Sequence, residues 1–68
     1  MKNNILTKRE KEIFRLLLDN NSILDISKKL NISDKTVRNH ISNVIQKLDV
    51  EDRCQAIILL LKLEEIYL

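Results

Sequence analysis

The chain has 68 residues, 44% of them hydrophobic and 32% charged, with a net charge of +2, one cysteine, one histidine and neither glycine nor proline. This composition excludes a disordered tail and a second domain, and it favours one compact all-α domain with a small core, because a chain this short buries only about 60% of its unfolded surface. One cysteine and one histidine exclude an internal disulfide and a structural zinc site, so we expect no metal and no cofactor. The sequence shows no secretory leader and no long apolar run, so we expect a cytoplasmic protein without a membrane partner.

The first predicted helix covers residues 7–20. Thr7 and Glu10 have the spacing of a capping box, in which each side chain accepts a hydrogen bond from the backbone of the other residue. A helix end needs a residue that tolerates the left-handed conformation, and Asn20 or Asn21 is the best available in a chain without glycine. Apolar residues at helical spacing supply the buried side, namely Ile13, Phe14, Leu16, Leu17 and Leu18.

Two further helices are predicted over residues 22–31 and 33–48, and a short turn joins them. Each begins at a serine that can cap it, Ser22 or Ser33. The longer helix has a polar, basic side opposite an apolar stripe, and the stripe consists of Val37, Ile41, Val44 and Leu48. A short helix, a tight turn and a longer helix with a polar face describe a helix-turn-helix, whose second helix enters the major groove of DNA.

The exposed side of this longer helix offers side chains for two kinds of DNA contact. Arg and Asn match the edges of guanine and adenine, and residues near the start of such a helix reach the bases. Residues 1–48 carry ten Lys or Arg against five Asp or Glu, as expected of a surface that meets a polyanion. The predicted base-edge contacts are Lys35, Arg38, Asn39 and Ser42, and the predicted phosphate contacts are Ser22, Ser33, Thr36, Asn43 and Lys47.

A fourth helix is predicted over residues 52–65, with Asp52 as its cap. At 100° per residue its apolar residues fall on two nearly opposite sides. One side packs on the core of the domain, and the other needs a partner, so we predict a homodimer contact. Two alternatives stay open: the domain buries this helix on both sides, or residues 66–68 fold back over it. The core side carries Ala56, Leu60 and Leu63, and the dimer side carries Cys54, Ile58 and Leu61.

The stretches LTKREKEIFRLLL and SILDISKKLNISDKTVRNHISNVIQKLDVEDRCQAI resemble the LuxR-type (GerE-like) helix-turn-helix domain, and the resemblance runs from Leu6 to about Ile58. It implies a single domain over 1–68 with a four-helix fold, a DNA-binding transcriptional regulator, and a fourth helix that makes the dimer contact. Glu10 and Arg53 stand where the family has a Glu and an Arg, and we predict that they form an ion pair between the first and fourth helices. The chain is most similar to a stand-alone spore-coat regulator of the family, which implies a role late in sporulation.

Enzymatic function is not indicated. His40 has no nearby acidic or cysteine partner, and the sequence contains no nucleophile with a base, no carboxylate cluster and no glycine loop, so we expect no catalytic residue. The expected partners are double-stranded DNA, a second copy of the chain and RNA polymerase, with no small-molecule ligand. The alternatives are a region similar to the promoter-binding part of a sigma factor, and a helix-turn-helix module that titrates another regulator or RNA polymerase without specific DNA binding.

Overall fold

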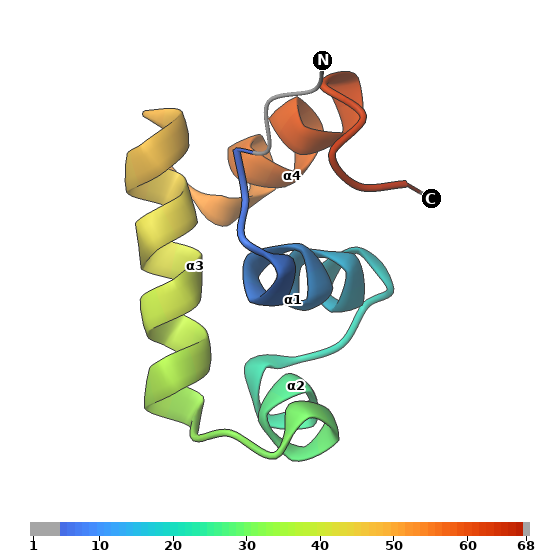
Figure 1. Ribbon diagram of the computed structural model, residues 1–68, viewed down its shortest axis with the longest axis vertical. Coiled ribbons are helices and arrows are strands. Elements are labelled where there is room, and N and C mark those ends of the chain that lie inside the picture. The colour runs from blue at the N-terminus through green and yellow to red at the C-terminus, as the bar shows by residue number, and fades with distance from the viewer. Residues whose placement is uncertain (1–4, 68) are drawn as a thin grey trace.

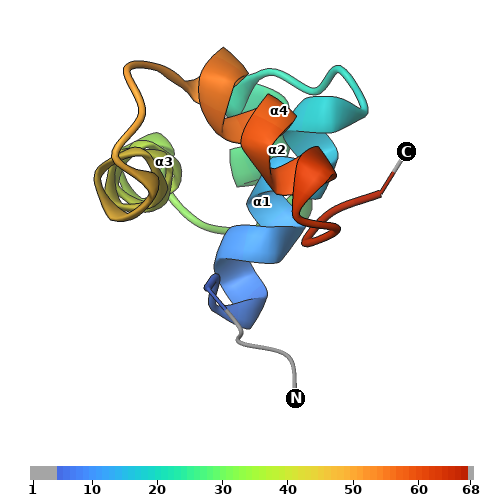
Figure 2. The ribbon, with the colours of Figure 1, turned by 90° about the horizontal axis from the view of Figure 1, so that it is seen from above.

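The computed structural model describes residues 5–67, and this range contains four helices and no β-strand, which confirms the predicted all-α class. Figure 1 shows the longest helix, α3, along one edge of the molecule. When the molecule is viewed along α3, as in Figure 2, the other helices lie to one side of it. One side of α3 therefore packs into the domain, and its other side is left uncovered. The helices are α1 (Lys8–Leu18), α2 (Ile23–Leu30), α3 (Asp34–Leu48) and α4 (Arg53–Lys62).

Every helix begins at a side chain that accepts a hydrogen bond from the backbone of its first turn. Thr7 and Glu10 form the predicted capping box of α1, with the Glu10 N–H donating to Thr7 Oγ1 over 3.1 Å and the Thr7 N–H donating to Glu10 Oε1 over 2.9 Å. Ser33 and Asp52 cap α3 and α4. These caps satisfy backbone N–H groups that have no partner inside a helix, so they fix where each helix starts.

Every helix also ends next to a residue in the left-handed conformation, although the chain has no glycine to offer there. The prediction for the end of α1 is confirmed at Asn20, whose φ is 65°. After each of the four helices, a backbone N–H donates to a carbonyl five residues earlier, which closes the last turn. The four left-handed residues are Asn20, Asn31, Asp49 and Glu64.

The segment after α4 differs from the predicted helix over 52–65. The helix ends at Lys62, and Glu64, with a φ of 58°, turns the chain so that Ile66 returns to the core with 1% of its surface exposed. Leu63, predicted on the core side of the helix, is 45% exposed because the helical register stops before it. Of the residues predicted to fold back, Ile66 does so, Tyr67 is exposed, and Leu68 lies outside the described residues.

The core lies where α3 meets the other three helices. α1, α2 and α4 all contact α3, and α1 also contacts α2. In the described part of the chain, no helix is long and apolar enough to cross a bilayer. The fully buried side chains come from all four helices and the returning segment, and the largest are Phe14, Ile13, Ile26, Leu60, Ile66, Val37 and Val44.

Candidate nucleic-acid interface

The outward side of α3 carries four polar side chains in one row. Lys35, Asn39, Ser42 and Gln46 are all exposed, and at 3.6 residues per turn they fall within about 60° of one another around the helix axis. With a rise of 1.5 Å per residue the row is about 16 Å long. Val37, Ile41 and Val44 on the opposite side are buried, as predicted, so the core holds the row outward.

Three of the four predicted base-edge residues lie in this row. Arg38 is also exposed, but it lies at the side of the row, toward α2 and the start of α4. Gln46 is absent from the predicted contacts. Its spacing from Lys35, Asn39 and Ser42 was the signal that could have placed it there, since residues four, seven and eleven positions apart share one helix face.

The predicted phosphate contacts near the helix starts already take part in capping. Ser33 Oγ accepts the Thr36 N–H over 3.0 Å, and the two hydroxyl oxygens lie 2.9 Å apart. Ser22 Oγ accepts the Asp25 N–H, and the Ser22 N–H donates to Asp25 Oδ2, both over 3.1 Å. Hydrogen bonds from Ser22 hold the pKa of Asp25 below its ordinary value. Ser22, Ser33 and Asn43 are exposed, and Thr36 is half-buried.

Lys47, the fifth predicted phosphate contact, binds a carboxylate within the domain. Its Nζ donates to Glu10 Oε1 over 2.7 Å and to the Ile5 carbonyl over 3.1 Å. Glu10 is 4% exposed, and its Oε1 also accepts the Thr7 N–H. Burial raises the pKa of Glu10, but the hydrogen bonds from Lys47 and Thr7 outweigh burial, so the pKa lies below its ordinary value.

The predicted ion pair between Glu10 and Arg53 is therefore wrong. Glu10 pairs with Lys47 of α3, and among the residues that the structure describes Arg53 takes part in no salt bridge. Arg53 is exposed at the first position of α4. The family position suggested the partner, but the cation that contacts Glu10 comes from the last turn of α3.

Arg53 lies on the wall of a shallow groove beside α3. The groove has a volume of about 470 Å³ and includes two arginine and two acidic side chains around an isoleucine floor. The Asp52 carboxylate is already used as a cap, because its Oδ1 accepts the Gln55 N–H over 2.9 Å. The lining residues are Ile23, Arg38, Ile41, Ser42, Ile45, Glu51, Asp52 and Arg53.

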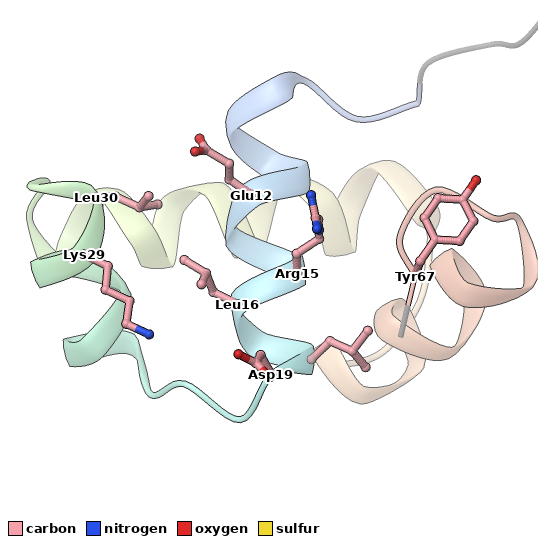
Figure 3. A pocket seen from close by; sticks show the side chains of 8 residues that line it. Glu12, Arg15, Leu16, Asp19, Lys29, Leu30 and Tyr67 are labelled. Atoms are coloured by element: carbon pink, nitrogen blue, oxygen red, sulfur yellow. The ribbon is translucent and has the colours of Figure 1, made fainter.

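A second open groove, of about 510 Å³, lies on the opposite side of α1 from α3. Figure 3 shows Leu16 on α1 between Lys29 and Leu30 of α2 on one side and Tyr67 on the other. Its charged residues are of both signs, with Glu12 and Asp19 against Arg15 and Lys29 in the full lining. This surface faces away from the polar row of α3.

Two of the three residues predicted for a dimer contact are exposed on the outer side of α4. Ile58 is 54% exposed and Cys54 is exposed, whereas Leu61 is half-buried and packs against the core. The core side of the same helix holds Ala56 and Leu60, which are fully buried. Cys54 and Ile58 are thus the two predicted dimer residues that remain on the surface.

A short α2, a turn over residues 31–33 and an outward polar face on α3 define a helix-turn-helix DNA-binding domain. The model of the GerE family, described as bacterial regulatory proteins of the luxR family, matches residues 4–60. The chain belongs to this LuxR family and is a DNA-binding transcriptional regulator. The family consists of transcription regulators rather than enzymes.

Individual relatives agree with this membership. The spore germination protein GerE of Bacillus subtilis strain 168 is 52% identical over 64 residues, which are 94% of this chain and 86% of that protein. A solved structure of the transcription factor GerE superposes with a TM-score of 0.93 at 58% identity, covering 96% of this chain and 97% of that one. The transcriptional regulatory protein DegU of Brevibacillus brevis is 50% identical over 54 residues, but this chain spans only 23% of its length.

Proposed function

We propose that the chain binds duplex DNA as a homodimer, with α3 of each copy in the major groove. The observation that carries this proposal is the outward row of α3, whose side chains are held away from the core and have the donors and acceptors that base edges require. Lys35, Asn39 and Ser42 contact base edges from the row, and Arg38 does so from its side. Gln46 extends the row toward the end of the helix.

Phosphate contacts fix the orientation of α3 in this proposal. An α-helix with its side chains is about 10–12 Å wide and the major groove is about 12 Å wide, so the backbones of the DNA pass close to both sides of the helix. The phosphates are contacted by hydroxyl, amide and backbone N–H groups near the start of α2 and along α3. The residues that supply them are Ser22 at the start of α2, and Ser33, Thr36 and Asn43 at the start of α3 or within it. Lys47, which the sequence predicts for the same role, already donates a hydrogen bond to Glu10 within the domain.

The homodimer rests on the outer side of α4. Ile58 and Cys54 are exposed there, while the domain has little further core with which to cover them. A two-fold contact between two copies of α4 buries both residues and sets two recognition helices about one DNA turn apart. The operator is then an approximate palindrome.

For the biological setting we propose a role in sporulation, which the similarity to the spore germination protein GerE supports. A protein that binds chromosomal DNA in this role acts in the cytoplasm, on the nucleoid. Regulation itself proceeds by contact with, or exclusion of, RNA polymerase at the promoter. A transcript-abundance profile of the gene through sporulation of its source organism tests the setting, and a flat profile contradicts it.

Selection from random duplex DNA tests the proposed binding mode. The purified protein is incubated with a random library near physiological salt, and the enriched sequences are read. We expect a two-fold motif with half-sites about one helical turn apart. A single, unrepeated half-site argues against the homodimer, and a folded protein that enriches no motif argues for the alternative, a protein-interaction module. Transcription in vitro from a promoter that carries the selected operator then shows whether the effect on RNA polymerase is activation or repression.

A further inference from the structure

The two sides of α3 differ in how their cations are used. On one side, Lys47 faces the start of α1, where it binds Glu10 and the Ile5 carbonyl. On the other side, Arg38 and Arg53 border the groove between α2, α3 and the start of α4. Both sides of a helix in the major groove meet DNA phosphates. The surroundings of the cations on each side decide which of them is free to bind a phosphate.

Lys47 is poorly placed to leave its partners. Glu10 is almost fully buried, and its Oε1 is shared between the Lys47 ammonium and the Thr7 N–H that belongs to the capping box of α1. Moving Lys47 to a phosphate leaves a buried carboxylate without its cation, which is strongly unfavourable. The same contacts join the last turn of α3 to the first turn of α1, so they set where the end of α3 lies.

Arg53 has the opposite surroundings. It is exposed, it takes part in no salt bridge among residues 5–67, and it shares its groove with Arg38 and Ser42, which are predicted DNA contacts. Of the two carboxylates in this groove, that of Asp52 is bound to the Gln55 N–H, which leaves Glu51 as the acidic side chain that can oppose a phosphate. A guanidinium group binds phosphate through two parallel hydrogen bonds.

We propose that Arg53 contacts a DNA phosphate beside Arg38, and that Lys47 is a positioning residue that holds the end of α3 against α1 through Glu10. This assignment exchanges the two roles predicted from the sequence, and it rests on the proposed function, in which α3 lies in the major groove. The row on α3 is then oriented by a contact inside the protein on one side and by a contact with DNA on the other.

The salt dependence of DNA binding separates the two roles. Each phosphate contact releases condensed counterions, so log K falls against log[salt] with a slope of about 0.9 for every contact. The dissociation constant for one selected operator is measured over a range of salt concentrations for the wild type, Arg53→Gln, Lys47→Gln and Arg15→Gln. Arg15→Gln is the matched control, since it removes the same charge from the far side of α1 (Figure 3). Thermal unfolding is measured for each variant.

We expect Arg53→Gln to make the slope shallower by about 0.9 for each copy of the chain bound and to leave the melting temperature unchanged. Lys47→Gln lowers the melting temperature and weakens binding by a similar factor at every salt concentration, with the slope of the control. Lys47→Arg, which keeps a cation near Glu10, restores both properties. The proposal is overturned if Lys47→Gln makes the slope shallower at an unchanged melting temperature, or if Arg53→Gln has the slope of Arg15→Gln.

Failure of this inference is distinguishable from failure of the proposed function. The salt dependence of each variant is also measured on a duplex of arbitrary sequence, because phosphate contacts contribute to nonspecific binding as well. A wild type that binds no duplex overturns both proposals. A wild type that enriches an operator, but whose slope is insensitive to Arg53→Gln, overturns only the inference. If Lys47→Gln does not fold, Lys47→Arg decides: the slope and the melting temperature of the wild type support the positioning role, and a changed slope at an unchanged melting temperature contradicts it.

Discussion

The helices α3 and α4 are both packed on the core by one side, but their outer sides differ in chemistry. The outer side of α3 carries Lys35, Asn39, Ser42 and Gln46, whereas the outer side of α4 carries Cys54 and Ile58. A polar row with forked donors matches base edges, and an apolar strip matches another apolar strip. The two outer sides therefore suit the two proposed partners: a duplex for α3 and a second copy of the chain for α4.

The two helices also differ in how strongly each depends on the rest of the domain. α3 contacts all three other helices, so its orientation depends on the whole domain. The outer residues Cys54 and Ile58 of α4 are exposed, so in the proposed homodimer we expect a substitution there to change assembly without changing the fold. Substitutions on the outer side of α4 are thus expected to lower the affinity that is gained by binding two half-sites at once. Substitutions on the outer side of α3 are expected to change the contacts that each copy makes with its own half-site.

The largest effect is expected from Ile58→Asp. A charge at the centre of the proposed dimer contact separates the copies, and loss of the second half-site lowers operator affinity by about 100-fold or more, since linked sites gain a factor of 10²–10⁴. The melting temperature of the monomer changes little, because Ile58 is 54% exposed. Light scattering and operator binding measure the two effects. Leu24→Asp, at a residue that is 52% exposed on α2, is the control for oligomeric state. A dimeric Ile58→Asp protein contradicts the α4 contact.

The next largest effect is expected on α3 from Asn39→Ala. A good bidentate contact contributes about 1–3 kcal/mol of discrimination between bases, so the variant loses preference at one position of each half-site and keeps the salt dependence of the wild type. Repeating the selection from random DNA with the variant shows the relaxed position. Asn21→Ala removes the same side chain from the turn after α1, and we expect the motif to survive it. A motif unchanged in Asn39→Ala would remove that residue from the base contacts.

The fold was predictable because its determinants are local. Thr7, Ser22, Ser33 and Asp52 cap helices through residues three positions further on, and such spacings are visible in the sequence. The end of α4 was predicted too late because Glu64 adopts a conformation that glutamate seldom takes, and nothing in its neighbourhood signals the turn.

The contacts between helices were less predictable. The partner of Glu10 is Lys47, 37 residues away, and choosing it over Arg53 requires the packing angle of α3 on α1. That angle results from the whole core, which no local pattern contains. The row of α3 shows the intermediate case. Periodicity places Lys35, Asn39 and Ser42 on one face, and Gln46 shares that face within the predicted helix over residues 33–48, so the sequence contained the signal for this residue as well.

A smaller effect, on stability, is expected from the contact that fixes α3. Glu10→Gln weakens the contact with Lys47, and we expect a loss of about 1–2 kcal/mol, less than for a fully buried pair because Lys47 reaches solvent. The pKa of Glu10 is lowered in the folded state, so its contribution is fully present above the unfolded value of 4.5 and is lost as the pH falls through the lower folded value. Melting temperatures between pH 7 and pH 2 measure this. The wild type loses its advantage over Glu10→Gln in acid, and a constant difference contradicts the role of the carboxylate. Glu12→Gln, at an exposed residue, is the control.

The smallest effects are expected at the ends of the two helices that were compared. Asp49, after α3, and Glu64, after α4, have φ values of 57° and 58°. A side chain other than glycine in this region costs about 1–2 kcal/mol, and Asp tolerates it better than Glu because its short polar side chain bonds locally. Both Asp49→Gly and Glu64→Gly are therefore stabilising, and the gain is offset in part by the greater freedom of glycine in the unfolded chain.

We expect the free energy of unfolding to rise by roughly 0.5 kcal/mol for Asp49→Gly and by about 1 kcal/mol for Glu64→Gly. A gain of about 1 kcal/mol raises the melting temperature of a domain this small by about 4–8 °C. Neither residue is among the proposed DNA contacts, so operator affinity stays the same in both variants. The order of the two melting temperatures decides the argument, because a larger gain at Asp49 means that the turn after α3, rather than the return of Ile66 after α4, holds the more strained residue.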